Sequence, residues 1–171
     1  MQSSDLILER GLEAFAAQFS AQLRNAGPPT SEHAVHFCIA LGFQVALNLS
    51  PGDVVFERFI PRARIDLWIV PLDGNAPFPL LNSAFTENHG KFSPDGRWVA
   101  YVSTESGRPE VYIRSFPEDM VKRQVSNQGG AQPRWSRDGK ELFYIDPNRQ
   151  LMSVKVRPNT SMEFETPSPL F

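Results

Sequence analysis

The feature that most constrains this chain is an internal repeat of about 43 residues. The segment Phe92–Gly96 (FSPDG) and the apolar run after it recur 43 positions later, beginning with Trp135–Gly139 (WSRDG). A weaker copy, Leu49–Asp53 (LSPGD), precedes both, with the last two turn residues inverted. Self-similarity at such a period is typical of architectures in which each unit buries its faces by packing on its neighbours.

Further strands follow each copy at similar distances. A second strand is predicted at 66–70, 110–114 and 150–154, and a third at 78–82, 123–127 and 168–171. The apolar runs are continuous or alternate with a period of two, as strands do. The sequence therefore predicts a mainly β chain with about three four-stranded antiparallel blades, at 47–84, 88–128 and 131–171, within a region that spans 46–171.

The repeated turn has a physical explanation. Pro94 sets φ at about −65°, Asp95 accepts hydrogen bonds from nearby backbone N–H groups, and Gly96 takes the positive φ that reverses the chain. Ser93 adds a local hydrogen bond, so we interpret it as a cap of the turn and not as a nucleophile. The same logic applies to Gly139 in the later copy.

These motifs resemble the TolB-like, WD-like β-propeller repeat. The resemblance rests on Phe92–Ser103 (FSPDGRWVAYVS) and Glu110–Arg114 (EVYIR), and it covers about residues 47–171. That repeat occurs in periplasmic TolB, in the propeller that gates prolyl oligopeptidase-type peptidases, and in sensor regions attached to bacterial serine/threonine kinases. Asp66–Gly74 and Gln128–Trp135 are most similar to the kinase-attached sort. The resemblance implies scaffold and recognition functions without chemistry.

The first 45 residues follow a different pattern. Apolar residues recur every three or four positions from Leu8 to Leu23, with polar residues between them. Gly27-Pro28-Pro29 ends this run, and a second helical segment reaches about Leu41. We predict an α-helical hairpin over residues 1–45, of no assigned family.

No catalytic, cofactor-binding or metal-binding residue is predicted, no cofactor is expected, and ligand-binding residues stay unassigned. His33 and His36 are three positions apart but lack a third ligand at a recognisable spacing. Ser93 lies in a turn, and the sequence has no Gly-x-Ser-x-Gly elbow. It also lacks a phosphate-binding P-loop and the motifs of a kinase active site.

A metal-dependent nuclease is the strongest enzymatic alternative. It would use Asp66, within Glu57–Ile69, together with a downstream Glu-x-Lys pair. Glu87 and Lys91 are four positions apart in a stretch that we expect to be a loop, so the second half of the pattern is incomplete. The repeat already accounts for Asp66, and we predict that the protein is not an enzyme.

Composition narrows the partners and the compartment. The chain has 17 basic and 19 acidic residues and a formal net charge of −2, so we expect no nucleic-acid partner. Cys38 is the only cysteine, which excludes an intramolecular disulfide. The chain as written starts without a signal peptide and has no long apolar run, so we expect a cytoplasmic location without membrane insertion. A periplasmic location follows if the true N-terminus is missing.

Aromatic residues recur at equivalent repeat positions, which is how core packing behaves. We therefore predict core side chains here and not a carbohydrate or nucleobase platform. The residues concerned are Trp68, Trp98, Tyr101, Tyr112, Trp135, Phe143 and Tyr144.

Three blades are too few to close a propeller, which usually has four to eight. Open sheet edges invite association, so we expect a protein partner or self-association through exposed blade edges, or a fragment of a longer protein. The predicted function is a non-catalytic protein-interaction or ligand-sensing module. The alternative is an accessory or gating propeller segment of a prolyl oligopeptidase-type peptidase or a serine/threonine kinase whose catalytic domain is absent.

Overall fold

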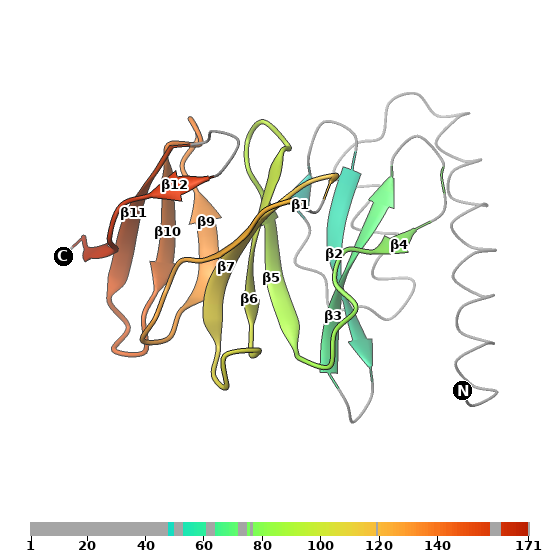
Figure 1. Cartoon of the computed structure of the whole chain (residues 1–171), viewed down its shortest axis with the longest axis horizontal. Coiled ribbons are helices and arrows are strands. Elements are labelled where there is room, and N and C mark those ends of the chain that lie inside the picture. Colours follow the sequence, from blue (N-terminus) through green and yellow to red (C-terminus); the bar gives the residue numbers. More distant parts are fainter. Residues whose placement is uncertain are drawn as a thin grey trace.

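The computed structural model describes residues 48–49, 53–60, 64–71, 75, 77–118, 120–157 and 162–170. Every regular element in these ranges is a β-strand, and the strands form three antiparallel sheets (Figure 1). The predicted mainly β, partial propeller of three blades is confirmed. The helical hairpin predicted for residues 1–45, with His33, His36 and Cys38, lies outside the described residues. None of the described residues forms a helix of the length and apolarity that crossing a membrane requires.

Each sheet is a meander in which consecutive strands are neighbours. Blade 1 consists of β1 (Asn48–Leu49), β2 (Asp53–Ile60), β3 (Arg64–Pro71) and β4 (Phe78–Pro79). Blade 2 consists of β5 (Glu87–Phe92), β6 (Trp98–Ser103), β7 (Glu110–Ser115) and β8 (Lys122–Gln124). Blade 3 consists of β9 (Ala131–Trp135), β10 (Glu141–Ile145), β11 (Leu151–Arg157), β12 (Glu163–Phe164) and β13 (Ser168–Pro169). Both β12 and β13 pair with β11, so together they form one outer strand in two pieces.

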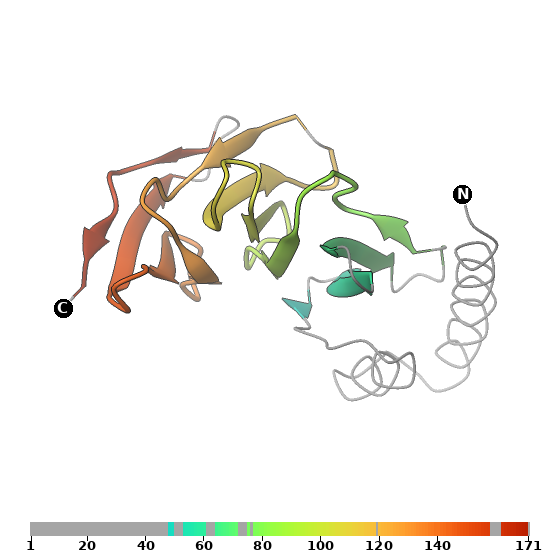
Figure 2. The ribbon, with the colours of Figure 1, turned by 90° about the horizontal axis from the view of Figure 1, so that it is seen from below.

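The blades fan out from a common inner side. Seen from below, β1, β5 and β9 lie on the inner side of the fan, and β4, β8 and β12 lie on the outer side (Figure 2). This is the arrangement of propeller blades around a channel.

One backbone hydrogen bond recurs in all three blades. It joins the outer strand to the start of the strand before it. The donors are the N–H groups of Leu80, Val125 and Leu170, and the acceptors are the carbonyl oxygens of Leu67, Val111 and Leu151, at 2.9, 2.8 and 2.8 Å. The predicted equivalence of the third strands is therefore confirmed at the level of single atoms.

The turn between β5 and β6 has the predicted chemistry. Ser93 Oγ donates to Asp95 Oδ1 at 2.6 Å and accepts from the N–H of Trp98 at 3.0 Å. Asp95 Oδ1 also accepts from the N–H of Arg97 at 3.2 Å, and Gly96 has φ = 72°. Ser93 is fully occupied as a cap, as predicted.

The turn between β9 and β10 repeats this network without the proline. Ser136 Oγ donates to Asp138 Oδ1 at 2.7 Å, and Asp138 Oδ1 accepts from the N–H of Lys140 at 3.1 Å. These two hydrogen bonds lower the pKa of Asp138. Gly139 has φ = 71°, and the position of a Cβ there would lie 3.5 Å from Cδ of Pro94, so the two turns are neighbours in space.

Blade 2 is buried on both faces. All six residues of β6 are buried. Val99 and Tyr101 belong to one apolar cluster with Leu67 of blade 1. Ala100 belongs to another, with Leu142 of blade 3. Such two-sided burial explains why β6 is a continuous apolar run and does not alternate.

Five of the seven aromatic side chains singled out in the sequence lie in or against the packed core: Trp98, Tyr101, Tyr112, Tyr144 and Trp135. Trp98, Tyr101, Tyr112 and Tyr144 are buried. Trp68, Trp135 and Phe143 are partly buried. Tyr101 and Tyr112 stack with ring centroids 5.8 Å apart. The prediction of core packing is confirmed for the four buried rings.

The positive φ of Gly139 makes this residue a test of the repeat. Replacing Gly139 with Val places a β-branched side chain in the left-handed region, and we expect the free energy of unfolding to fall by about 1–3 kcal/mol. Lys140→Val, one position later on an exposed residue without positive φ, should change it by about 0.5 kcal/mol or less. Urea unfolding followed by circular dichroism measures both. Equal losses in the two variants would contradict the role of the turn.

Candidate functional site

The residues of the nuclease alternative lie on strands. Asp66 is on β3, and Glu87 and Lys91 are both on β5, so the loop expected around Glu87 is wrong. The polar stretch forms a strand that carries a bulge between Asn88 and Lys91, where His89 has φ = 55°. A bulge breaks the period of two, which is why the sequence did not show the strand.

Gly90 fixes the contact of this bulged strand with blade 1. A Cβ at Gly90 would lie 2.9 Å from Cγ2 of Val55 and 3.1 Å from Cδ2 of Leu67. The backbone of β5 therefore lies directly on the face of blade 1. Pro133 holds the equivalent position on β9, 43 residues later, and is buried.

Asp66 has a structural partner. Arg64 Nε donates to Asp66 Oδ1 at 2.7 Å, and Asp66 is only 3% exposed. Blade 2 repeats the pair, because Arg108 Nε donates to Glu110 Oε1 at 2.8 Å and Glu110 is 1% exposed. The signal that sequence reasoning missed is an arginine two positions before an acid at the same place in two repeats.

Glu110 fastens the linker that leaves blade 2. It accepts hydrogen bonds from the N–H of Gly129 at 2.8 Å and from the hydroxyl of Ser126. Arg108 Nη2 donates to the carbonyl oxygen of Asn127 at 2.6 Å. The ion pair between Arg108 and the buried Glu110 therefore has a structural role. Across the described residues, no group of three or more His, Cys, Asp and Glu side chains is placed to hold a metal ion.

Glu87 is a buried carboxyl group with one oxygen that lacks a hydrogen-bond partner. It is 1% exposed, its Oε1 accepts from the hydroxyl of Ser83, and its Oε2 has no hydrogen-bond partner. Burial raises the pKa of Glu87, the hydrogen bond from Ser83 opposes this, and the nearby carboxylate of Asp66 raises it further. The charge of Glu87 therefore affects the stability of the fold where blades 1 and 2 meet.

The face of blade 3 that points away from blade 2 differs from the equivalent face of blade 2, which blade 3 covers. In β10, Leu142 and Tyr144 are buried, while the residues that alternate with them are only partly buried. Phe143 pairs with Ser153 and Ile145 pairs with Leu151 across β10 and β11, so these four side chains share one face. We call the surface formed by Phe143, Ile145, Leu151, Ser153 and Leu170 the open face.

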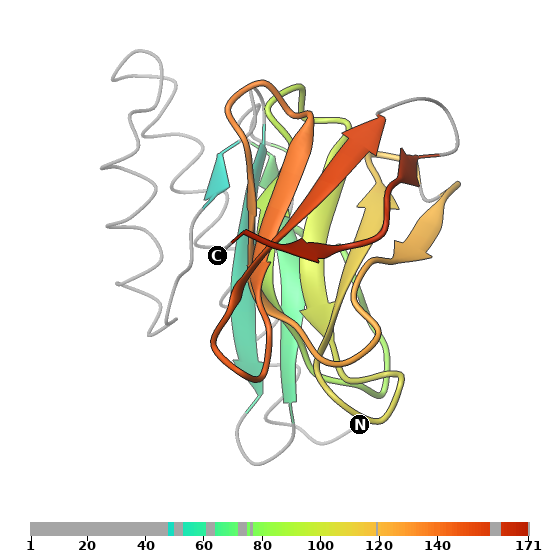
Figure 3. The same ribbon diagram turned by 90° about the vertical axis from the view of Figure 1, so that its left-hand side faces the viewer.

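Burial at equivalent positions shows that the open face lacks a cover. Leu80 and Val125, which correspond to Leu170, are 8% and 5% exposed, whereas Leu170 is 48% exposed. In the part of the chain that the structure describes, no sheet covers the face of blade 3 that points away from blade 2. This face is turned toward the viewer in Figure 3. The open face is an apolar sheet face presented to solvent.

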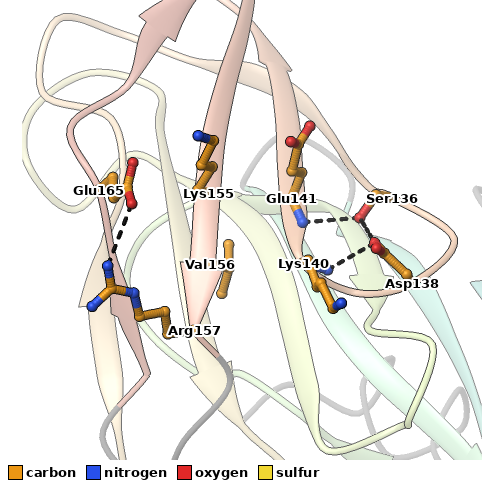
Figure 4. A pocket seen from close by; sticks show the side chains of 8 residues that line it. All are labelled: Ser136, Asp138, Lys140, Glu141, Lys155, Val156, Arg157 and Glu165. Atoms are coloured by element: carbon orange, nitrogen blue, oxygen red, sulfur yellow. Dashed lines mark hydrogen bonds and ion pairs between the residues drawn. The ribbon is translucent and has the colours of Figure 1, made fainter.

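A shallow hollow of about 500 Å³ lies at one end of blade 3 (Figure 4). Three acids and three bases line it together with a serine and a valine: Ser136, Asp138, Lys140, Glu141, Lys155, Val156, Arg157 and Glu165. Arg157 and Glu165 form an ion pair at 3.5 Å, and the hydroxyl of Ser136 is used within the turn. Balanced and mostly solvated charges do not select a charged substrate, and we assign no chemistry to this hollow.

Comparison with known proteins gives several relatives of this chain. No family model matches the chain. It is 36% identical over 90 residues to the Tol-Pal system protein TolB of Pseudomonas aeruginosa, which covers 52% of this chain and 21% of TolB. It is 31% identical over 110 residues to TolB of Thioalkalivibrio sulfidiphilus, covering 64% of this chain and 25% of that protein. It is also 34% identical over 83 residues to Tricorn protease homolog 1 of Streptomyces coelicolor, covering 47% of this chain and 8% of that protein.

Solved structures agree on the fold. TolB from Acinetobacter baumannii superimposes with a TM-score of 0.56 at 19% identity, over 75% of this chain and 34% of TolB. The β-propeller domain of the Trilobed protease from Pyrococcus furiosus superimposes with a TM-score of 0.52 at 15% identity, over 73% of this chain and 42% of that domain. The resemblance to a TolB-like β-propeller is confirmed, and the region is a propeller module that spans a quarter or less of the curated relatives' lengths. Similarity to kinase-attached propellers stays a prediction.

The raised pKa of Glu87 predicts a pH-dependent stability difference. The folded state binds this proton more tightly than the unfolded state, so the wild-type chain loses stability as pH rises above the ordinary value of 4.5. We expect Glu87→Gln to raise the unfolding temperature at pH 7, by an amount that shrinks as pH approaches 4.5.

Differential scanning calorimetry from pH 4.5 to 7 checks this, with Glu118→Gln, an exposed glutamate, as the matched control. A Glu87→Gln variant that is less stable than wild type at pH 7, or an equal gain in the control, would contradict the assignment.

Proposed function

We propose that this chain is a non-catalytic binding module, a TolB-like propeller segment that associates with another sheet through the open face of blade 3. The observation that carries the proposal is the 48% exposure of Leu170 where its two counterparts are buried. Burial of apolar surface is the main favourable term in protein association, and an exposed apolar sheet face offers it.

The chain itself indicates the kind of partner. The face of blade 1 receives β5 at Gly90, and the face of blade 2 receives β9, whose Trp135 Nε1 donates to the carbonyl oxygen of Lys91 at 3.0 Å. The same type of face therefore receives the inner strand of a blade twice within one molecule. We propose that the partner is a blade of the same kind, supplied by a second copy of this chain.

A segment of a larger peptidase is the second candidate, because one curated relative is named a protease homolog. In that case the blade that covers the open face belongs to the larger protein, and a catalytic domain is encoded next to this segment. The two candidates agree that the chain has no activity of its own. Turnover of ester or peptide substrates above background by the purified chain would overturn both.

The compartment follows from the same proposal. A role like that of the repeat in periplasmic TolB places the chain in the periplasm, and a cytoplasmic location is the alternative. In either compartment we expect no nucleic-acid partner and no insertion into a membrane.

Removing the apolar character of the open face should abolish self-association. Leu170→Glu keeps the backbone hydrogen bond to Leu151 and adds a charge that the interface would have to desolvate. We expect a dimer or larger assembly for the wild-type chain, and a dissociation constant at least about 10-fold higher for the variant. Size-exclusion chromatography with light scattering, over a range of concentrations, measures this.

Met120→Glu is the matched control, because Met120 is 78% exposed and lies outside the open face. It should leave the assembly unchanged. A wild-type chain that is a folded monomer at every concentration would contradict self-association, and equal losses in both variants would show that the open face is not the interface.

A further inference from the structure

Each blade has two faces, and the packing of the blades leaves one face at either end of the fan without a neighbouring blade (Figure 2). One apolar cluster joins blades 1 and 2, and a second joins blades 2 and 3. The open face remains at the blade 3 end. At the other end remains the face of blade 1 that points away from blade 2, and a second copy could in principle meet either.

The strand register assigns the side chains of this blade 1 face. Val54 pairs with Val70, and Phe56 pairs with Trp68, across β2 and β3. These residues alternate along their strands with the residues of the cluster shared with blade 2, so they point to the opposite side. We call the surface formed by Val54, Phe56, Trp68 and Val70 the back face.

The back face is already buried within one copy. Val54 and Phe56 are each 2% exposed, and Val70 is 7% exposed. Trp68 is partly buried, its Nε1 is enclosed, and the guanidinium carbon of Arg58 lies 4.8 Å from the centre of its ring. The back face therefore offers little apolar surface to the blade of another copy, in contrast to Leu170 on the open face.

The other large apolar side chains that are exposed among the described residues do not form a further sheet face. They are Phe78, Phe85 and Met120. Phe78 pairs with Ile69, on the side of blade 1 that meets blade 2. Phe85 lies between β4 and β5, and Met120 lies between β7 and β8. Within the described part of the chain, the open face is thus the one apolar sheet face that a second copy can present.

The charges beside the open face allow it to meet its own copy. Glu141 pairs with Lys155 across β10 and β11, two positions from Phe143 and Ser153, so both lie on the side of the open face. Arg134 pairs with Phe143 across β9 and β10 and lies on the same side. The strand with the acid lies between the two strands with the bases. A surface with both signs can place acids against bases in its copy, whereas a surface of one sign repels its copy.

We propose that the open face binds the open face of a second copy around a two-fold axis, and that the assembly closes as a dimer. This inference rests on the proposed function, because it needs association through the open face. A head-to-tail ring would lay the open face on the back face of the next copy, where the apolar side chains are already buried. In the two-fold arrangement two sheets pack face to face, both copies of Leu170 are covered, and no open face remains to extend the assembly.

Cross-linking from a single cysteine tests the symmetry. Ser153 lies on β11, a middle strand of blade 3, so a two-fold axis through the sheet centre brings its two copies close together. In a Cys38→Ser chain, Ser153→Cys should cross-link to itself with a short bis-maleimide, and the covalent dimer should be the largest product. Ser106→Cys, at an exposed residue between β6 and β7, is the matched control and should not cross-link.

Sedimentation velocity of the wild-type chain, over a range of concentrations, should show monomer and dimer without larger species. Adding Leu170→Glu should abolish the Ser153→Cys cross-link. Equal cross-linking of Ser153→Cys and Ser106→Cys would overturn the two-fold contact.

Two further outcomes separate this inference from the proposed function. Assemblies that grow beyond the dimer and are lost in Leu170→Glu would overturn the two-fold arrangement while the open face stays the interface. A folded chain that is monomeric at every concentration would overturn both the arrangement and the self-association on which it rests.

Discussion

A four-stranded blade has two apolar faces and cannot bury either of them by itself. In this chain the constraint is met by laying the inner strand of each blade on the face of the blade before it. Gly90 allows the backbone of β5 to approach Val55 and Leu67, and the buried Pro133 repeats the contact on β9. Two clusters of buried side chains result, one on each side of blade 2. The turns, ion pairs and outer strands all serve to hold this stacking in register.

Much of the fold could be predicted from the sequence because the turns carry their chemistry locally. Serine, aspartate and glycine within five positions define a hydrogen-bonded turn wherever the segment lies, and Gly96 and Gly139 adopt the same φ within a degree. The inner strands could not be predicted in the same way. His89 and Gln132, 43 residues apart, both have positive φ of 55° and 54°, and the bulges they make hide the strand period. A tertiary contact with the preceding blade supports these bulges, and no local pattern encodes it.

The candidate sites were less accessible to sequence reasoning than the fold. The open face appears only when the burial of Leu80, Val125 and Leu170 is compared, because the three residues have the same apolar character in the sequence. Lys91 follows Glu87 by four positions in the sequence, but in the fold its pKa responds to the charges of Arg134 and Glu57, which come from two other strands. The buried acids Asp66 and Glu110 were detectable in principle, since an arginine precedes each by two positions.

The neighbouring turns have a consequence for recognition. The Ser93–Gly96 and Ser136–Gly139 turns have the same hydrogen-bonded shape, and Gly139 lies next to Pro94. They form a short row of nearly identical epitopes at a fixed spacing. A ligand that recognises one turn weakly meets the second at a high effective concentration if its own two contact points match that spacing. Avidity of this kind would reward a repetitive partner whose contact points match the spacing of the two turns.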